Sequence, residues 1–380
     1  MQPRVHLAVD NCFASKRWTS PAAWAGLVRD LGLKCVEASA DNECDPLYMG
    51  PEYLRDWIGE VKEAEAATGV KVVNLYSGHG SYATLGLSHP DPRVRERMHR
   101  GWLEAMVDMA AELGAGLGFF CHAFSQEQLS SPERYAAARD ELCGRLASLA
   151  SRAEAKGVPR VGVEQMYSPQ QIPWTIAGAE ELLREVKARA GADFHLTIDT
   201  GHQCGQRKFL RPGYGQLKAA RRELDRGGHL EGFWLGAEST AALFKAGALE
   251  DALADMERFP HLFAAHEDGD TYEWLERLGR HSPIVHLQQT DGKASAHLPF
   301  DAKHNATGVI EGGELLRALA KSYRQEAAGM PKPCADIYLT LEIFAGTAEL
   351  PSDIIDKLAA SVAYWRRFVP EDGLTLDKLL

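Results

Sequence analysis

Short apolar runs alternate with longer amphipathic stretches along most of the chain. The apolar runs are rich in Val, Ile and Leu, as expected of parallel strands that helices cover on both sides. They predict eight strands, at residues 4–10, 34–39, 71–76, 116–122, 160–166, 194–200, 283–289 and 336–344.

The stretches between these runs repeat apolar residues at helical spacing and carry helix start and stop signals. Ser20 is followed by a proline, an N-cap and first-turn pair that opens a helix running to Gly32. Further helices are predicted at residues 92–113 and 132–156, each stopped by a glycine, and at 314–326 after two glycines.

This alternation of strand and helix predicts an α/β fold, either a closed barrel or a long doubly wound sheet. No Gly-x-Gly-x-x-Gly motif follows the first strand, which disfavours a dinucleotide-binding sheet. We therefore expect residues 1–380 to form a single (β/α)₈ TIM-barrel domain.

One interval does not fit a simple barrel. The sixth and seventh predicted strands are much further apart than the others, which leaves residues 205–268 as an insertion with helical patterns at 215–224 and 241–256. Because segments that follow a barrel strand emerge at its C-terminal face, we expect this insertion to form a lid over the active site.

Composition and charge narrow the classes of function. The 380 residues are 45% hydrophobic, which suits one large core, and 42 Lys and Arg against 53 Asp and Glu give a net charge of −11. A negative chain repels a phosphate backbone, so nucleic acid is disfavoured as a partner. Seven cysteines without a Cys-x-x-Cys pair suit free thiols in the cytoplasm, and neither a secretory signal nor a membrane span is expected.

Charged residues fall at the C-terminal ends of the predicted strands, where burial is costly unless the residue has a function. Carboxylates and imidazoles that converge there would repel one another unless a cation neutralised them. An oxygen-rich site of this kind favours Mn²⁺ or Mg²⁺, while Zn²⁺, Co²⁺ and Fe²⁺ are also compatible. The residues are Asp10, Glu37, His79, His122, Glu164, Asp199, His286 and Glu342.

These motifs resemble the xylose isomerase-like barrels, which include sugar-phosphate isomerases and epimerases and the endonuclease IV type of DNA-repair enzyme. The similarity is carried by Ile-Asp-Thr-Gly-His at 198–202, by Val-His-Leu at 285–287, by the glutamates that end strands five and eight, and by the loop 304–312. The resemblance implies one divalent metal, with His202 contacting the substrate. The implied metal ligands are Glu164, Asp199, His286 and Glu342.

Such a site suggests proton transfer in a sugar or sugar phosphate through an enediolate. Glu164 and Glu342 are the expected acid/base pair. Proton return to the opposite face gives epimerisation, and return to the neighbouring carbon gives aldose–ketose isomerisation; the sequence leaves both open. A ketose phosphate is one expected substrate, and we expect a small-molecule substrate rather than nucleic acid or membrane. The expected substrate-binding residues are His79, His122, His202, Arg207, Lys208, Lys293 and His304.

An alternative reading is a multi-zinc phosphodiester hydrolase of the endonuclease IV type. The histidines of this chain match much of that family's ligand pattern, but Ala302 stands where the pattern has Asp, and the negative charge disfavours DNA. The sequence also differs from the epimerase pattern at two positions, because Gln170 and Gly292 stand where that pattern has Glu and Arg. The sugar, the reacting carbon and the formation of a homo-oligomer stay open.

Overall fold

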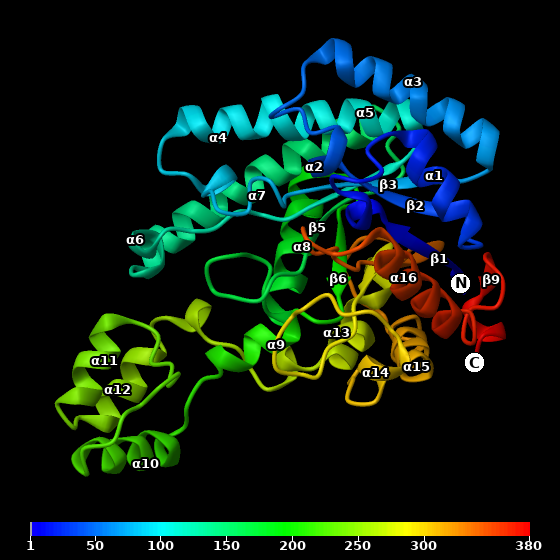
Figure 1. Cartoon of the computed structure of the whole chain (residues 1–380). Coiled ribbons are helices and arrows are strands. Elements are labelled where there is room, and N and C mark those ends of the chain that lie inside the picture. Colours follow the sequence, from blue (N-terminus) through cyan, green and yellow to red (C-terminus); the bar gives the residue numbers. More distant parts are fainter. Residues whose placement is uncertain (1) are drawn as a thin grey trace.

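A closed barrel of parallel strands forms the centre of the computed structural model, which describes residues 2–380 (Figure 1). The strands follow one another around the barrel in chain order, and pairing of β1 with both β2 and β8 closes it. The barrel strands are β1 (Arg4–Asp10), β2 (Cys35–Ser39), β3 (Lys71–Ser77), β4 (Gly116–Phe119), β5 (Val161–Glu164), β6 (His195–Asp199), β7 (Ile284–Leu287) and β8 (Asp336–Leu341).

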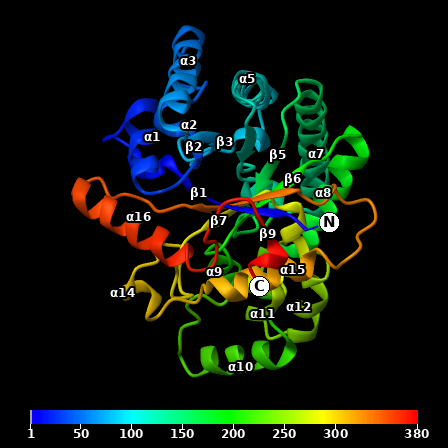
Figure 2. The same cartoon turned by 90° about the vertical axis from the view of Figure 1, so that its right-hand side faces the viewer.

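All eight predicted strands are confirmed, and the closed barrel replaces the doubly wound alternative. Most strands end earlier than predicted, since pairing stops where the chain turns outward into a loop. The clearest cases are β4, which ends at Phe119 instead of residue 122, and β8, which ends at Leu341 instead of residue 344. A short strand that was not predicted, β9 (Leu374–Thr375), pairs antiparallel with the start of β1 (Figure 2).

Helices surround the strands and cover the outer face of the barrel (Figures 1 and 2). The longer ones in this layer are α1 (Pro21–Asp30), α3 (Pro51–Thr68), α4 (Pro92–Met98), α5 (Ala105–Leu113), α7 (Pro132–Ala155), α8 (Ile176–Ala190), α13 (Thr271–Leu278), α15 (Gly312–Ser322) and α16 (Pro351–Trp365). Single-turn helices α2 (Ala40–Glu43), α6 (Gln126–Leu129), α9 (Gln203–Gln206) and α14 (Ala302–Asn305) lie in the loops.

The helix signals read from the sequence act largely as expected. The Ser20 side chain accepts a hydrogen bond from the backbone N–H of Ala23 and begins α1, and Gly114 ends α5 in the left-handed conformation. The predicted helix 92–113 is interrupted, however, by a π-helical turn at His99–Glu104. The helix predicted at 314–326 runs instead from Gly312, because Glu311 caps it, to Ser322.

The segment between α9 and α13 contains three α-helices, α10 (Tyr214–Asp225), α11 (Glu238–Lys245) and α12 (Leu249–Met256). The prediction of one helix at 241–256 is wrong, because Gly247 adopts a φ of 83° and separates α11 from α12. Figure 1 shows these three helices extending outward from the barrel. The return segment is tied to α8 through Asp268, whose carboxylate accepts hydrogen bonds from the backbone of Ile176 and Ala265.

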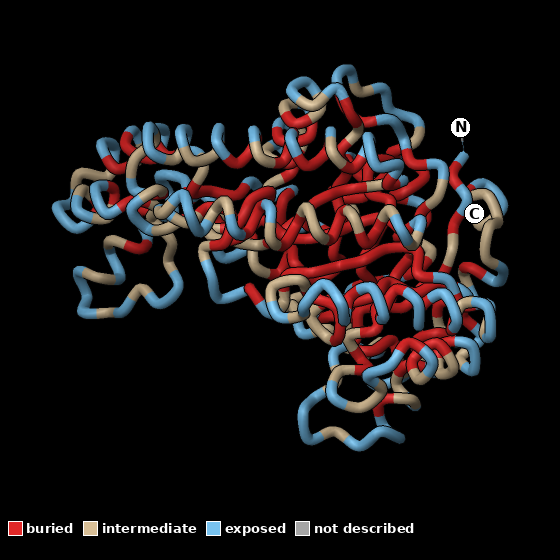
Figure 3. Tube along the Cα trace, turned by 90° about the horizontal axis from the view of Figure 1, so that it is seen from above, coloured by how far each residue is buried: buried red, intermediate tan, exposed pale blue. Residues whose placement is uncertain are grey.

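The core lies between the strands and the helix layer, where the buried parts of the trace gather (Figure 3). Its largest fully buried side chains include Trp24, Trp57, Trp102, Trp274 and Trp365, all from the helical segments around the barrel. All seven cysteines are free. No helix within residues 2–380 has both the length and the apolar character needed to cross a membrane.

Candidate active site

Four charged side chains meet where β5, β6, β7 and β8 end. Glu164 and Asp199 are the last residues of β5 and β6, and His286 is the next-to-last residue of β7. Glu342 follows β8 directly. Asp199 and His286 face each other in the strand register. All four side chains are almost completely buried, and each can place a ligand atom within 4.8 Å of the others'.

The imidazole of His286 stands between the two glutamates. Its Nδ1 lies 2.8 Å from Glu164 Oε1 and 3.3 Å from Glu342 Oε2. Its other nitrogen, Nε2, lies 3.2 Å from Glu37 Oε2. One ring nitrogen therefore faces the cluster, and the other faces a buried carboxylate behind it.

Burial and charge push the pKa values in this cluster apart. Burial lowers the pKa of His286, but the surrounding Glu342, Glu37 and Glu164 outweigh it and raise the pKa well above its ordinary value. Burial, with the nearby charges of Glu164 and Asp199, raises the pKa of Glu342 to about 8. Burial also raises the pKa of Glu164, but the ion pair with His286 outweighs it, so this pKa is lowered.

The cluster has the donors and charge that a divalent cation requires. Three carboxylates and one imidazole match the oxygen-rich sets that hold Mn²⁺ or Mg²⁺ and are also compatible with Zn²⁺. Glu342 Oε2 is buried without a hydrogen-bond partner, which is costly unless a cation supplies one. The arrangement therefore fits a metal held by Glu164, Asp199, His286 and Glu342.

Contacts with Gln288 explain why Asp, Thr and Gly follow one another in the Ile-Asp-Thr-Gly-His motif. Its amide nitrogen donates to both oxygens of Asp199, at 2.8 and 3.0 Å, and its backbone N–H and C=O both bond to the Thr200 hydroxyl. A Cβ added at Gly201 would lie 2.4 Å from the Gln288 amide carbon, so this position requires glycine. The motif thus fixes the orientation of the Asp199 carboxylate.

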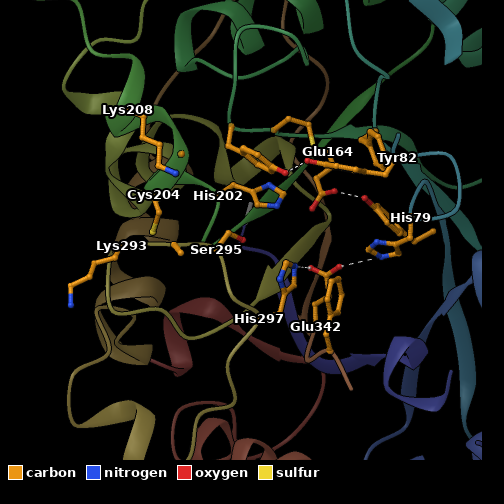
Figure 4. A pocket seen from close by; sticks show the side chains of 17 residues that line it. His79, Tyr82, Glu164, His202, Cys204, Lys208, Lys293, Ser295, His297 and Glu342 are labelled. Atoms are coloured by element: carbon orange, nitrogen blue, oxygen red, sulfur yellow. Dashed lines mark hydrogen bonds and ion pairs between the residues drawn. The ribbon is translucent and has the colours of Figure 1, made fainter. Parts of the chain in front are cut away.

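The cluster forms one wall of a cavity of about 500 Å³ (Figure 4). A cavity of this size suits a small molecule. His79 and His202 line it, with His79 Nε2 3.7 Å from Glu342 Oε1. His202 Nδ1 donates to the backbone carbonyl of Gln165 at 2.7 Å, which leaves its Nε2 free to accept a hydrogen bond.

The structure brings some of the expected substrate-binding residues to this cavity and keeps others away. His79, His202, Lys208 and Lys293 line it. His122 does not belong to the described lining: its Nε2 lies 2.7 Å from Ser81 Oγ, and its ring packs against Phe120 and Trp102.

Two further expected residues have other partners. The guanidinium of Arg207 donates to the backbone carbonyls of Gly269 and Gly292, so it holds the loop that carries Lys293. His304 pairs with Asp301 at 2.8 Å on α14. We therefore expect neither side chain to contact the substrate.

Several residues that line the cavity were not predicted from the sequence. The Tyr76 hydroxyl donates to Glu164 Oε2 from β3, and its position within an apolar run gave no sign of this role. His297 lies in the loop after β7 and approaches Glu342. The remaining wall is largely apolar or aromatic and includes Tyr82, Phe120, Met166, Tyr167 and Phe344.

The insertion reaches the cavity only through its first residues. Gly205 and Lys208 belong to the lining, whereas α10, α11 and α12 contribute none of the described residues of this wall. The three helices extend outward from the barrel (Figure 1), and their closure over the active site stays a prediction.

Comparison with known proteins gives a family and a fold. A family model described as "Xylose isomerase-like TIM barrel" matches residues 25–228. The D-erythrulose 1-phosphate 3-epimerase of Brucella abortus is 24% identical over 353 residues, which cover 89% of this chain and 88% of that protein.

Solved structures share the fold. One from Rhodospirillum rubrum, described as a candidate xylose isomerase, superposes with a TM-score of 0.70 at 21% identity and covers 96% of this chain and 99% of its own. The D-psicose 3-epimerase of Clostridium cellulolyticum H10, solved with D-tagatose, gives a TM-score of 0.56 at 13% identity, covering 95% of this chain and 98% of its own.

Proposed function

The chain belongs to the xylose isomerase-like TIM barrels, and on that premise we propose that it is a metal-dependent sugar epimerase. The observation that carries this proposal is that two buried carboxylates approach the same nitrogen of one imidazole at the wall of the cavity. Glu164 and Glu342 lie 2.8 and 3.3 Å from His286 Nδ1, at the wall of a cavity of small-molecule size. The sugar epimerases named above support the same class.

We propose that Glu164, Asp199, His286 and Glu342 hold one divalent ion, with Mn²⁺ favoured over Mg²⁺, Co²⁺ or Zn²⁺. When bound, the ion would stabilise the negative charge that develops on the oxygens of a ketose as the adjacent carbon loses its proton. The protein's own contribution is to fix the donors, exclude water from them by burial and orient Asp199 through Gln288.

The proton is moved by the two glutamates. We assign acceptance of the proton from carbon to Glu164 and its return to Glu342, since both carboxylates are buried at the wall of the cavity. The Tyr76 hydroxyl bonds to Glu164 Oε2 and leaves Oε1 toward the cluster. Removal on one face and return on the other inverts the carbon, and the name of the Brucella relative supports this epimerisation over aldose–ketose isomerisation.

We propose a ketose phosphate as substrate, as the name of the Brucella relative suggests. Lys208 and Lys293 both line the cavity, and they provide positive charge for a phosphate next to an otherwise acidic site. His79 and His202 would contact the sugar hydroxyls. Closure of the 205–268 insertion over the substrate is part of the same proposal, as are a cytoplasmic location and assembly as a homo-oligomer.

Solvent exchange tests this function. The Mn²⁺-loaded protein is incubated in D₂O with D-erythrulose 1-phosphate and with unphosphorylated ketoses, and NMR follows deuterium at the carbon beside the carbonyl. Glu164→Gln and Glu342→Gln should each lower exchange by roughly 10²- to 10⁴-fold while the fold is retained. Glu43→Gln, which changes a buried carboxylate elsewhere, is the matched control.

Full exchange in either variant would show that the glutamates are not the acid/base pair, and absence of exchange by the wild type with every ketose would refute the function. Metal analysis separates the alternative hydrolase, for which about three zinc ions per chain are expected instead of about one. Among residues 2–380, the groups that can share an ion include neither His122 nor His304, which the hydrolase pattern uses.

A further inference from the structure

The loop after β7 carries an imidazole into the cavity in an unusual backbone conformation. His297 has a φ of 48°, in the left-handed region that non-glycine residues rarely adopt. Such a conformation costs roughly 1 kcal/mol or more and persists only where neighbouring contacts impose it. Two sets of contacts do so here.

The first set holds the backbone. The N–H of His297 donates to Gln288 Oε1 at 2.7 Å, while the Gln288 amide nitrogen holds Asp199. The same loop returns to β7 through the bridge between Gln289 and Leu298. The position of the loop is therefore tied to the carboxylate of a candidate metal ligand.

The second set holds the ring. The imidazole of His297 stacks flat on Phe344, with ring centroids 3.8 Å apart and planes 9° from parallel. Its Nε2 lies 3.4 Å from Glu342 Oε2, and only 13% of the side chain is exposed. Figure 4 shows the ring turned toward Glu342 at the cavity wall. A face packed on an aromatic ring leaves the nitrogen edge as the part that can bind.

We propose that His297 is a substrate-binding residue that holds a hydroxyl of the ketose beside Glu342, the group we assign to return the proton. This inference rests on the proposed function and adds a residue that fixes which carbon faces that carboxylate. Gln288 Nε2 lies 3.3 Å from His297 Nε2 and can only donate, so this ring nitrogen acts as an acceptor. A ketose hydroxyl that donates to it would lie beside Glu342, whose Oε2 is 3.4 Å away.

This role differs from that of a ligand to the proposed ion. His297 belongs to a group with Asp199 and His202 that can also surround an ion, but it lies outside the group formed by Glu164, Asp199, His286 and Glu342. Loss of the imidazole of His297 should therefore weaken substrate binding and leave intact the binding of the ion proposed at Glu164, Asp199, His286 and Glu342.

The test compares His297→Asn with His304→Asn. Asparagine tolerates a positive φ better than most residues, so the loop can keep its conformation. His304 is a matched control because its imidazole pairs with Asp301 outside the cavity. Mn²⁺ affinity and ketose binding are measured by calorimetry, the latter on Mn²⁺-loaded protein with D-erythrulose 1-phosphate, and steady-state kinetics give KM and kcat separately.

We expect His297→Asn to weaken ketose binding by about 10- to 100-fold, with Mn²⁺ affinity within about threefold of the wild type. Unchanged ketose binding would overturn the inference, and so would an equal loss of Mn²⁺ affinity, which would make His297 a metal ligand. If the wild type binds the ketose but exchanges no deuterium, the epimerase proposal fails, while the calorimetry still decides the role of His297.

Discussion

Replacing Glu37 by glutamine should weaken metal binding although Glu37 is outside the candidate ligand set. Glu37 and His286 are both fully buried, and Glu37 Oε2 lies 3.2 Å from His286 Nε2. A carboxylate there keeps the proton of the imidazole on Nε2, so that Nδ1 presents its lone pair to the cluster.

The neighbouring amide makes glutamine a poor replacement. Asn74 Nδ2 donates to Glu37 Oε1 at 3.0 Å, and its orientation is fixed by a second bond to the backbone carbonyl of Leu75 at 3.1 Å. In Glu37→Gln the amide oxygen must therefore face Asn74, which turns the new NH₂ group toward His286 Nε2. That donor favours the tautomer with the proton on Nδ1, which cannot bind a metal.

Loss of an outer partner of this kind typically lowers metal affinity about 10- to 100-fold, or about 1.4–2.7 kcal/mol. Calorimetric titration with Mn²⁺ measures it directly, and thermal unfolding of the metal-free proteins checks that the fold is kept. Glu43→Gln is the control, because Glu43 is buried and hydrogen-bonded to Trp24 and Asn11, away from His286. Equal Mn²⁺ affinity in Glu37→Gln and Glu43→Gln would refute the reasoning.

Three further predictions follow from other parts of the structure. Burial raises the pKa of Glu43 to about 7, so its contribution to stability is full below its ordinary pKa of 4.5 and is lost as the pH rises through about 7. The unfolding free energy of the wild type, relative to Glu43→Gln, should therefore fall by about 3 kcal/mol over that range in denaturant titrations, and a constant difference would contradict this. Asp268→Ala should cost about 1–3 kcal/mol by the same measurement, because one buried and one partly buried backbone N–H group lose their acceptor; a loss no larger than that of Asp270→Ala, an exposed helix cap, would count against it. Replacing residues 214–256 by a flexible linker should lower kcat/KM at least about tenfold with Mn²⁺ affinity retained, if the insertion closes over substrate, and an unchanged kcat/KM would exclude closure.

The barrel was predictable because its strands are buried on both sides. Continuous apolar runs that end in a charged residue identify both the strands and the end of the barrel at which the charges gather. Glu164, Asp199, His286 and Glu342 were found in this way, and the structure brings them together. The same reasoning expected His122 at the substrate, whereas its side chain contacts Ser81 and Trp102, a direction that depends on tertiary packing beyond the end of β4.

The loops were less predictable for a related reason. His297 reaches the cavity through a positive φ and a stack on Phe344, and neither follows from apolar periodicity. From the sequence, Arg207 was expected to offer its charge to a substrate. In the structure its guanidinium donates hydrogen bonds to backbone carbonyls of two loops distant in the chain. Such roles depend on contacts between segments far apart in the chain, which a local pattern does not encode.

The four candidate ligands all belong to the second half of the barrel, whereas Glu37 and Tyr76 reach the same cluster from β2 and β3. The first half of the barrel thus contributes groups that hold His286 and Glu164 in place without being candidate ligands themselves. Substitutions in the first half can adjust the strength of the site without altering its composition.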